Sequence, residues 1–573
     1  LQEDIKTTID KDQHTITTTV AFGTDVTALK PEITISEKAS ITPENETPVN
    51  FTNVVTYKVT AEDGSTQDYV VTVNIAKSSD KVIKRFIFLV SDNNTLNEDF
   101  EADIDEDNKM IKVKLPHRVD LTSLIPTVEV SPGAAVLPKG KEATDFSNPV
   151  DYTVTAADGS SQKYTVTVTK SRSARDVLIA IDNANPGNRL GWDQNESDLS
   201  KWFGITLTNN AVTKIDIEGD NLDVLPPEIG DLLELDTLRI RSNGLTDLPA
   251  EIGELRGLKE LNLTANRIKT LPEEMGNLTE LVILYVGRNE LKELPQSLGS
   301  LQNLKILSIA LNEFIDFPES ITKLNNLEEL YADENELGVI PETIGALKNL
   351  KHLRLTENKL GSLPQAIGQL ASLEELYAAR MDISDLPAEI SMLTNLKDLR
   401  LCNNAFESFP KVILSLPNLE ILELRNNNIS TLPDEITNLK SLKYLDIGFC
   451  GLRSLPKTIE GLENLEVLFL TSNILNSLLP EIGNLSNLKE LRAPFTRLRA
   501  LPEALGKLKK LEILDVSSNQ ITSLPPELGN LDNLKTLNVV FNNELITFPE
   551  PLCELIDRND VQVFGGNLNS LCK

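Results

Sequence analysis

The residues best suited to contact a ligand are tyrosines and arginines that recur at regular intervals. Tyr285, Tyr331 and Tyr377 follow one another 46 residues apart, and Arg354 and Arg400 come 23 residues after the last two. Tyrosine offers a rigid aromatic face with a hydroxyl group, and arginine offers a planar fork of donors, a combination suited to binding. A 46-residue duplication would produce the same series, because Leu-Glu-Glu-Leu-Tyr-Ala occurs twice at that interval. Both explanations stand at this point.

A second group of aromatic residues lies nearer the C-terminus. Phe449, Phe495 and Phe541 are also 46 residues apart. Exposed aromatic side chains at this density mark an interaction surface. The alternative is that Phe449 and Phe495 fold over turns whose usual asparagine is replaced, at Cys450 and Thr496. The candidate ligand-binding residues of the chain are therefore Tyr285, Tyr331, Arg354, Tyr377, Arg380, Arg400, Tyr444, Phe449, Phe469, Phe495 and Phe541.

Residues that could catalyse a reaction are few and scattered. The 3 histidines lie far apart in the chain, so no catalytic triad or metal site with a recognisable spacing can be drawn. No glycine-rich phosphate loop and no Cys-x-x-Cys pair occurs. Carboxylates such as Glu423, Asp446 and Asp515 could pair, but chance accounts for such pairs in a chain with 86 acidic residues. We expect no enzymatic activity, no metal and no cofactor.

The candidate residues sit in copies of a 23-residue repeat. Each copy has Leu at positions 1, 4 and 6, Asn at 9, an aliphatic residue at 11, and commonly Leu-Pro at 14 and 15. Fifteen copies begin between Val212 and Leu534. This pattern resembles the leucine-rich repeat family. The resemblance implies a curved α/β horseshoe solenoid, with a parallel β-sheet on the concave face and a mostly irregular or 3-10 convex side.

The repeat also predicts which positions are buried and which face a ligand. A short strand is expected at about positions 3 to 8, with positions 1, 4, 6, 11, 14, 18 and 21 in the interior. The asparagine at position 9 can bond backbone groups of the turn that a leucine side chain would leave unsatisfied. The solenoid tyrosines fall on positions 3 or 5, which point to the concave face.

The first 170 residues contain two copies of another unit at a constant offset of 95 residues. Each copy is rich in Thr and Val, alternates apolar with polar residues, and carries an Asp-Gly pair typical of a two-residue hairpin loop. We expect two small antiparallel β-sandwiches, which resemble immunoglobulin- or cadherin-like modules of bacterial surface proteins. The strand at 82–90 precedes the second copy and has no counterpart in the first. Either the chain is truncated there or that edge is open.

Both ends of the repeat array require caps, because an uncovered end repeat would expose its apolar flank to water. Residues 171–211 contain a helical stretch at 176–182, then Trp192 and Trp202, and resemble the N-terminal cap of plant-type leucine-rich repeat proteins without its cysteines. The tryptophans are expected in the cap core. Cys553 and Cys572 could be bridged or free. Cys402 and Cys450 lie two repeats apart, too far for a disulfide, and are expected to be buried thiols.

Composition limits the class of partner. The net charge of −31 and the absence of a basic cluster argue against nucleic acid or an anionic membrane surface as a partner. No apolar run is long enough for a membrane helix, and no signal peptide is present. Any membrane attachment would come from a lipid anchor that precedes this sequence. We expect a monomer.

These observations predict the following organisation. The ranges 1–77 and 78–170 form the two sandwiches, 171–211 the cap, 212–549 the fifteen repeats and 550–573 the C-terminal cap. The resemblance implies a secreted or surface-anchored bacterial protein, such as a lipoprotein, whose sandwiches act as a stalk. The predicted function is recognition of, or adhesion to, a protein partner through the concave face. The alternative is a glycan-binding protein that uses the tyrosine column.

Overall fold

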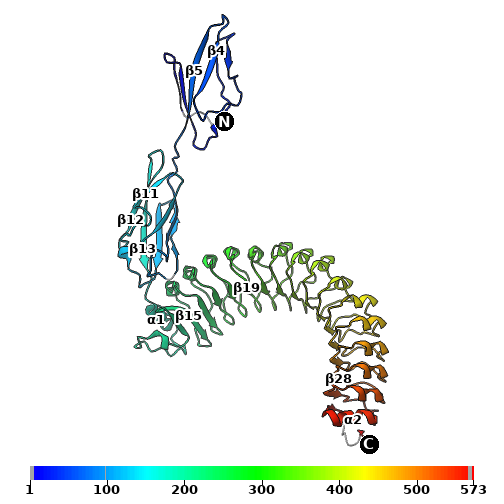
Figure 1. Ribbon diagram of the computed structural model, residues 1–573. Coiled ribbons are helices and arrows are strands. Elements are labelled where there is room, and N and C mark those ends of the chain that lie inside the picture. The colour runs from blue at the N-terminus through cyan, green and yellow to red at the C-terminus, as the bar shows by residue number, and fades with distance from the viewer. Residues whose placement is uncertain (1–5, 97, 566–570, 573) are drawn as a thin grey trace. The chain divides into compact units, whose positions relative to one another are not determined.

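The computed structural model describes residues 6–96, 98–565 and 571–572. They belong to two compact units, Leu1–Ser171 and Arg172–Lys573. The first unit holds the two β-rich copies and the second holds the cap and the repeat array (Figure 1).

The first copy forms one described five-stranded sheet in the order β1-β2-β5-β4-β3. Its strands are β1 (Lys6–Asp10), β2 (Thr15–Val20), β3 (Ser40–Thr42), β4 (Val55–Thr60) and β5 (Thr66–Ile75). Its core is small, because only Val26, Phe51, Tyr57 and Val71 cluster as buried residues.

The second copy repeats this sheet and adds another. The first sheet has the order β11-β12-β13-β9-β8 and the second the order β10-β6-β7. The strands are β6 (Ile83–Phe88), β7 (Phe100–Glu101), β8 (Asp103–Asp105), β9 (Met110–Leu115), β10 (Thr127–Val130), β11 (Ala135–Leu137), β12 (Val150–Thr155) and β13 (Ser161–Lys170). Phe86 and Phe88 of β6 pack against Phe146 with ring centroids 6.3 and 5.3 Å apart. Within residues 6–77 no strand plays the part of β6.

Two expectations for these copies are wrong. The sheets are mixed, because β2 runs parallel to β5 and β9 runs parallel to β13. In the second copy, the chain between β9 and β13 crosses to the other sheet, where it forms β10. Strand β13 can therefore return to the first sheet parallel to β9. The hairpin loops have three residues, since Ala61 and Ser65 still pair across the loop and Gly64 takes the left-handed conformation at φ 81°.

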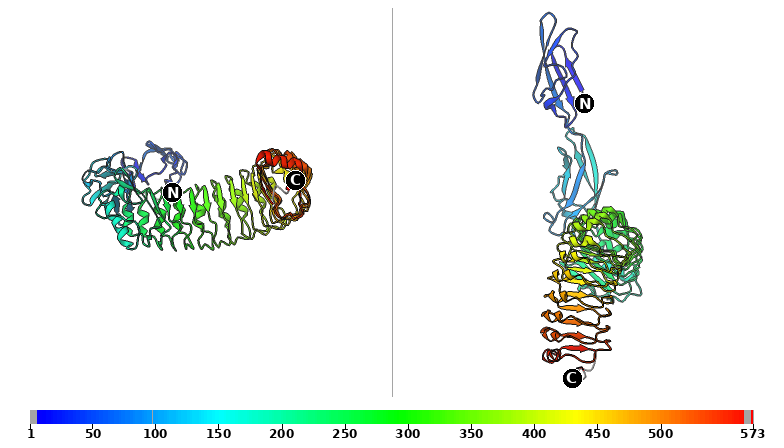
Figure 2. Two further views of the ribbon diagram at one scale, coloured as in Figure 1. Left: turned by 90° about the horizontal axis from the view of Figure 1, so that it is seen from below. Right: turned by 90° about the vertical axis from the view of Figure 1, so that its right-hand side faces the viewer.

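The second unit is built on one 17-stranded sheet. Strand β14 (Ile205–Thr208) pairs antiparallel with β15 (Ala211–Glu218), and β15 to β30 (Gln562–Phe564) are parallel neighbours. The strands β16 to β29 are Thr237–Arg241, Glu260–Asn262, Ile283–Tyr285, Ile306–Ser308, Glu329–Tyr331, His352–Arg354, Glu375–Tyr377, Asp398–Arg400, Ile421–Glu423, Tyr444–Asp446, Val467–Phe469, Glu490–Arg492, Ile513–Asp515 and Thr536–Asn538. Each of the fifteen copies thus contributes one strand, and the array curves with its strands inside (Figures 1 and 2).

The outer side of the array carries one 3-10 helix in most copies, after the proline at position 15. These helices are Pro227–Asp231, Ala250–Glu254, Glu273–Asn277, Gln296–Ser300, Glu319–Lys323, Glu342–Ala346, Gln365–Gln369, Ala388–Met392, Lys411–Ser415, Asp434–Asn438, Lys457–Gly461, Pro480–Asn484, Glu503–Lys507 and Pro526–Asn530. Proline fixes φ at a value that suits the start of such a turn. The predicted single-turn convex side is confirmed.

The predicted interior of the repeat is confirmed, while the strands are shorter than expected. In the copy that begins at Leu258, the seven predicted interior positions are all buried. Strands β17 to β29 cover only positions 3 to 5. The backbone at position 8 has a positive φ in all fifteen copies, which ends the extended segment no later than position 7, where β15 and β16 end.

Asparagine at position 9 bonds two neighbouring copies together. The Nδ2 group of Asn289 donates to the carbonyl oxygens of Leu263 and Val286, each at 3.0 Å. Its Oδ1 accepts the N–H of Ile268 at 3.0 Å. Asn289 is buried, so these bonds satisfy backbone groups that water cannot reach.

Three of the four exceptions to this asparagine column are also interior residues, and the fourth, Asp220 in the first copy, is half-buried. Met381, Cys450 and Thr496 are at most 1% exposed. The N–H of each donates to the asparagine of the next copy, as Cys450 does to Asn473 at 3.2 Å. These buried side chains therefore replace the asparagine within the interior and are not placed to contact a ligand.

The N-terminal cap has the predicted core. Helix α1 (Ala174–Ala184) begins after Ser173, whose hydroxyl accepts the N–H of Asp176. Trp192 and Trp202 are buried and stack with centroids 5.1 Å apart. Helix α2 (Glu550–Asn559) covers the other end of the array.

A disulfide closes the C-terminal cap. Cys553 of α2 is bonded to Cys572, while Cys402 and Cys450 are buried free thiols as expected. The bridge spans 19 residues, and a loop of that size lowers the entropy of the unfolded chain by an amount worth about 3 kcal/mol.

Removal of this bridge tests its role. The double variant Cys553→Ser, Cys572→Ser is expected to lose about 3 kcal/mol of unfolding free energy, measured by urea denaturation. The wild type in dithiothreitol should match the variant. A wild type whose urea midpoint does not change on reduction would show that the bridge contributes nothing.

Candidate functional site

The concave face is formed by the side chains at positions 3 and 5 of each strand. The leucine at position 4 points inward, as Leu330 and Leu376 do at 0% exposure. Their neighbours Tyr331 and Tyr377 are half-buried on the opposite side of the strand. Alternation along each strand therefore places both tyrosines on the concave face.

Four position-5 side chains in consecutive strands form one continuous stack. Tyr331, Arg354, Tyr377 and Arg400 are direct partners in the sheet register. The guanidinium carbon of Arg354 lies 5.1 Å from the Tyr331 ring centroid and 4.6 Å from that of Tyr377. Arg400 lies 4.5 Å from the Tyr377 ring on its other side. Each arginine is thus held over an aromatic face, and we call these four residues the Tyr/Arg stack.

Acidic neighbours fix the orientation of the stack. Arg400 donates to Asp398 at 3.0 Å and contacts Glu423 at 3.2 Å. The hydroxyl of Tyr377 donates to the same Asp398 at 3.1 Å. The Nε–H of Arg354, in contrast, is buried and has no hydrogen-bond partner among the described residues. The Arg354 side chain as a whole is 39% exposed, so a partner that supplies a carbonyl or carboxylate oxygen can pair with the exposed part of its guanidinium group.

The titration behaviour of the site favours binding over catalysis. Burial, with Asp398 next in effect, raises the pKa of Tyr377 to about 12, so this residue presents a neutral hydroxyl. Burial and Glu423 raise the pKa of the Cys402 thiol to about 12. A thiol in that state is a poor nucleophile.

The remaining predicted residues are divided among separate places. Tyr285 shares position 5, but Ser308 separates it from the Tyr/Arg stack in the sheet register. Arg380 lies at position 8, outside the strand, and is paired with Glu357 at 2.5 Å. Tyr444 and Phe469 contact each other edge to face, with centroids 5.4 Å apart, on β25 and β26.

The three position-8 phenylalanines lie at the edge of the concave face, just beyond the strands. Phe449, Phe495 and Phe541 are 41%, 60% and 71% exposed. Arg425 lies over the Phe449 ring at 4.5 Å. Cys450 satisfies its own turn, since its Sγ lies 3.2 Å from the carbonyl oxygen of Leu424. The phenylalanines are therefore not needed to cover the altered turns.

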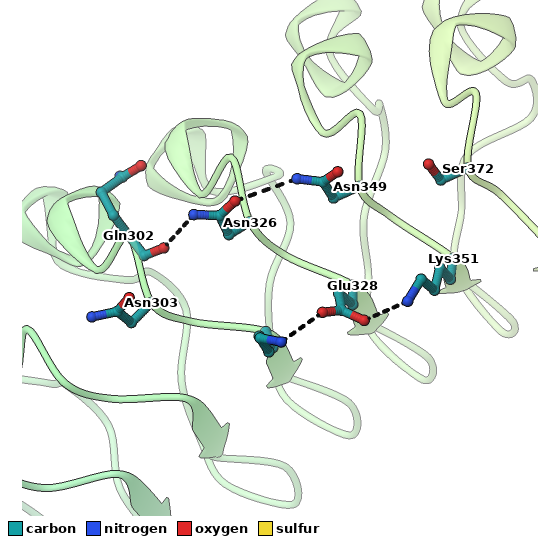
Figure 3. Close-up of a pocket in the computed structure, with 8 residues that line it drawn as sticks. Gln302, Asn303, Asn326, Glu328, Asn349, Lys351 and Ser372 are labelled. Carbon is teal, nitrogen blue, oxygen red and sulfur yellow. Dashed lines mark hydrogen bonds and ion pairs between the residues drawn. The ribbon is translucent and has the colours of Figure 1, made fainter.

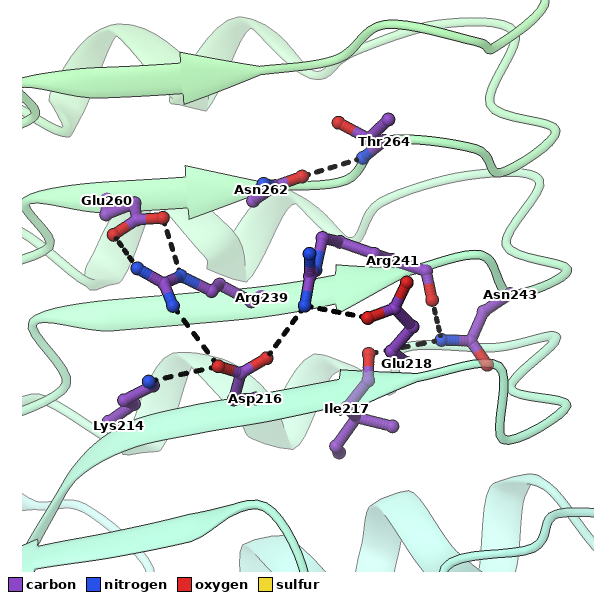
Figure 4. Close-up of polar contacts among 10 residues, drawn as sticks. All are labelled: Lys214, Asp216, Ile217, Glu218, Arg239, Arg241, Asn243, Glu260, Asn262 and Thr264. Carbon is purple, nitrogen blue, oxygen red and sulfur yellow. Dashed lines mark hydrogen bonds and ion pairs between the residues drawn. The ribbon is translucent and has the colours of Figure 1, made fainter. Parts of the chain in front are cut away.

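Sequence reasoning missed an ion-pair network at the start of the concave face (Figure 4). Arg239 donates to both oxygens of Glu260, at 2.6 and 2.7 Å, and to Asp216 at 3.2 Å. Arg241 contacts Glu218 at 2.8 Å. These charges neutralise one another, so this part of the face offers a ligand fewer free groups than the Tyr/Arg stack. The sequence feature that could have indicated this network is the alternation of acidic and basic residues at position 5 and at the adjacent strand positions of the first copies.

Sequence reasoning also missed a ladder of charged residues at position 2, just before each strand. The residues from Lys305 to Lys535 alternate strictly between Lys and Glu at 23-residue steps. Glu328, for example, bonds Lys305 at 3.0 Å and Lys351 at 2.6 Å. Figure 3 shows these residues beside a depression that is lined by amide and charged side chains. No apolar or aromatic side chain lines it, so we do not assign it as the site.

Asp446 lies under the C-terminal half of the face and is 5% exposed. Its Oδ1 accepts the N–H of Gly448 at 2.8 Å. Burial raises the pKa of this carboxyl group. Between its unfolded pKa and its higher folded pKa, the folded state binds more protons than the unfolded state. Stability from this group therefore falls as pH rises through that window, and the penalty persists above it.

The variant Asp446→Asn should remove this penalty, because the amide keeps the acceptor oxygen and carries no charge. We expect a higher melting temperature than that of the wild type at pH 7, and a difference that shrinks as pH falls toward 3.8, the ordinary value for Asp. Thermal unfolding across this pH range measures it. The matched variant Asp515→Asn, at position 5 and only half-buried, should show a smaller gain. A variant less stable than the wild type at pH 7 would contradict the assignment.

Comparison with known proteins identifies the family. The model for a leucine-rich repeat region matches residues 250–336, 334–426 and 402–493, and the model for two-copy leucine-rich repeats matches 509–554. A leucine-rich repeat protein of Leptospira interrogans, of known structure, is 35% identical. The match covers 69% of this chain and 99% of that one, with a TM-score of 0.59. The chain belongs to the leucine-rich repeat proteins.

This leucine-rich repeat protein carries a second family match in its N-terminal copies. The model for the N-terminal region of SGBP, the surface glycan-binding proteins, matches residues 1–73 and 92–168. The 95-residue offset is thus two copies of that domain. The leucine-rich repeat ectodomain of the Arabidopsis thaliana receptor kinase GASSHO1/SCHENGEN3, solved with Casparian strip integrity factor 2, is 24% identical. That match covers 68% of this chain and 55% of the receptor with a TM-score of 0.50, which shows the fold alone.

Two further findings concern the chain as a whole. A search of curated proteins finds no match to it. Among the described residues, no helix combines the length and the apolar character needed to cross a bilayer. Leucine-rich repeat and SGBP families are typically non-enzymatic binding proteins, and nothing in the site indicates catalysis.

Proposed function

We propose that this leucine-rich repeat protein is a non-enzymatic cell-surface protein that recognises a protein partner through its concave face. The Tyr/Arg stack carries this proposal. Tyrosine and arginine are the residue types most enriched at the energetic centres of protein interfaces. Here four of them are already ordered by contacts to each other, so little side-chain entropy is lost when a partner binds.

The Tyr/Arg stack also indicates which chemical groups a partner would need. The partly exposed guanidinium group of Arg354 would pair with an acceptor, and the half-buried rings of Tyr331 and Tyr377 offer apolar faces beside it. A backbone carbonyl or an acidic side chain flanked by apolar groups meets both needs. Tyr285, Arg380, Tyr444 and Phe469 would extend the contact along the array.

Glycan binding is the second candidate, and the SGBP match favours it. That match covers two consecutive copies in the same chain, and tyrosine rings can stack on sugar faces. The two copies would then be immunoglobulin- or cadherin-like stalk modules that hold the array away from a bacterial surface. A lipid anchor ahead of this sequence would place a monomer there.

One paired experiment separates the candidates. The full chain is applied to a glycan array and, in parallel, immobilised to capture proteins from the surface fraction of host or neighbouring cells. The proposal expects a specific protein, whose capture is lost with Tyr331→Ala, Tyr377→Ala, and a blank glycan array. Sugar binding that is lost with the same double variant would establish the second candidate instead. Binding of either kind that survives the double variant would remove the stack as the site.

A further inference from the structure

A second surface with a different chemistry runs along the edge of the last six copies. It consists of exposed phenylalanines at position 8 and of arginines at positions 7, 10 and 12. We call this surface the Phe/Arg rim, and its residues are Phe449, Phe495, Phe541, Arg425, Arg453, Arg497 and Arg499.

The rim differs in charge from the rest of the protein. In the six copies from Leu419 to Leu534, positions 7 to 14 contain 4 arginines and 1 acidic residue, Glu544. The same positions contain 7 acidic residues in just the three copies from Leu281 to Leu327. Arg453, Arg497 and Arg499 are exposed, and no acidic side chain among the described residues forms an ion pair with them. The rim is a basic edge on a chain whose net charge is −31.

The phenylalanines occupy a backbone conformation that does not favour them. Their φ angles are 56°, 58° and 58°, in the left-handed region where bulky side chains are uncommon. Residues other than glycine and asparagine lose about 1 kcal/mol or more there. Exposure of 60% for Phe495 and 71% for Phe541 means that burial in the fold does not offset this cost. The repeat imposes this conformation at position 8 of every copy, so the phenylalanines differ from the other copies in being large, apolar and exposed. Exposed aromatic side chains of this kind mark an interaction surface.

The spacing of the phenylalanines selects the shape of that partner. They recur in every second copy, and two strand spacings amount to about 10 Å. In an extended polyproline-II-like chain, three residues rise about 9 Å and return to the same side. Every third side chain of such a segment therefore meets successive phenylalanines.

We propose that the Phe/Arg rim binds an extended acidic polypeptide segment that carries an apolar side chain at every third residue. The proposal rests on the proposed binding role of the array and adds a separate site to it. The intervening carboxylates would pair with Arg497 and Arg499, since guanidinium and carboxylate match as two parallel hydrogen bonds. Arg425, stacked on Phe449, would fix the end of the segment nearest the Tyr/Arg stack.

Other occupants fit the rim less well. An anionic bilayer is wider than the rim and would also face the acidic remainder of the chain, which repels it, whereas a peptide segment contacts the rim alone. Phenylalanine has no hydrogen-bonding group for sugar hydroxyls. An acidic peptide uses both the arginines and the phenylalanines.

The test uses the full chain and two synthetic peptides. One has Leu at every third residue with Glu between, and the other has Lys in place of Glu. Fluorescence anisotropy at low salt should show at least tenfold tighter binding of the acidic peptide. Arg497→Glu with Arg499→Glu should weaken it at least tenfold. The matched control Arg267→Glu, also exposed and also at position 10 in an earlier copy, should leave it unchanged.

The phenylalanine variants separate binding from folding. Phe495→Asn should weaken the acidic peptide at least tenfold without lowering the melting temperature, because asparagine tolerates the left-handed conformation. Leu311→Asn makes the same change at position 8 of an earlier copy, where φ is 56°, and should keep peptide binding intact. Equal binding of both peptides, loss of binding in the two control variants, or preference for anionic vesicles or glycans over the acidic peptide would overturn the proposal.

The proposals for the Tyr/Arg stack and for the Phe/Arg rim can be refuted independently of each other. The double variant Tyr331→Ala, Tyr377→Ala should bind the acidic peptide as the wild type does. If the peptide fails to bind while the concave partner is still captured, the rim proposal alone is wrong. If the peptide binds and no concave partner is found, the rim stands and the proposed function of the Tyr/Arg stack falls.

Discussion

Replacement of Tyr331 and Tyr377 together by alanine is expected to weaken binding of the concave partner by about 100-fold or more. Central aromatic residues of an interface each contribute about 2 kcal/mol or more. The double change also removes both ring faces from Arg354, whose guanidinium lies 5.1 and 4.6 Å from them. The arginine would then be free to adopt other rotamers and would lose entropy on binding. Affinity is measured by surface plasmon resonance with the captured partner.

Two further variants show whether the stack, rather than general concave area, is responsible. Arg354→Lys keeps the charge but loses the planar group, so it should weaken binding at least tenfold. Asn262→Ala changes the same position 5 in an earlier copy and should have little effect. If Arg354→Lys binds as tightly as the wild type, the partner reads only charge, and the stacked geometry has no role.

The variant Asn289→Leu is expected to destabilise the array by about 1 to 3 kcal/mol. It would leave the buried N–H of Ile268 without a partner, while the carbonyl oxygens of Leu263 and Val286 would each keep a second bond, from Asn266 and Asn312. Each buried backbone group that loses its hydrogen bond costs about 1 to 3 kcal/mol. Because each copy contacts only its neighbours, the loss should appear first as increased hydrogen exchange in the copies around Asn289.

A matched surface asparagine provides the control. Asn349 lies at the last position of its copy, is exposed, and donates to the carbonyl oxygen of Asn325 at 3.0 Å and to Oδ1 of Asn326 at 3.3 Å. Asn349→Leu should change the urea midpoint little, since water replaces these exposed bonds. Equal losses in the two variants would show that the buried asparagine is no more important than a surface one.

The sequence was most informative about what is buried. Positions such as 1, 4 and 6 of the repeat must be apolar in every copy, and asparagine at position 9 hydrogen-bonds to the backbone of two copies. Both requirements therefore appear in the sequence as residue types that recur every 23 residues. The strand length could not be read in the same way. Its outer limit is the left-handed backbone at position 8, which accepts Ser, Ala, Arg, Glu or Phe and so leaves no residue pattern.

The N-terminal copies show a similar limit. Alternation of apolar and polar residues identified β5 and β13 as strands, but it carries no information on the direction of their neighbours. The parallel pairing of β9 with β13 depends on a crossover through the other sheet. The match to the SGBP domain likewise lay outside what residue patterns could indicate.

At the candidate site, the sequence located the tyrosines and arginines but not their partners. Whether Arg354 lies between two rings, or whether Asp398 accepts bonds from both Tyr377 and Arg400, depends on rotamers in adjacent strands. Arg380 was placed with the stack because it is close in sequence. The turn after the strand instead carries it to the edge, where it pairs with Glu357.

The alternation of Lys and Glu at position 2 determines how many copies can be added or removed at once without disturbing the ion pairs of the array. Removal of one 23-residue copy would preserve the leucine interior and the asparagine column, because both recur in every copy. It would nevertheless put Lys beside Lys or Glu beside Glu at the junction, where Glu328 now lies between Lys305 and Lys351. The same deletion would place tyrosine beside tyrosine or arginine beside arginine in the stack. An internal gain or loss of 46 residues leaves both patterns intact, so pairs of copies are the natural module for recombination and for engineering of this chain.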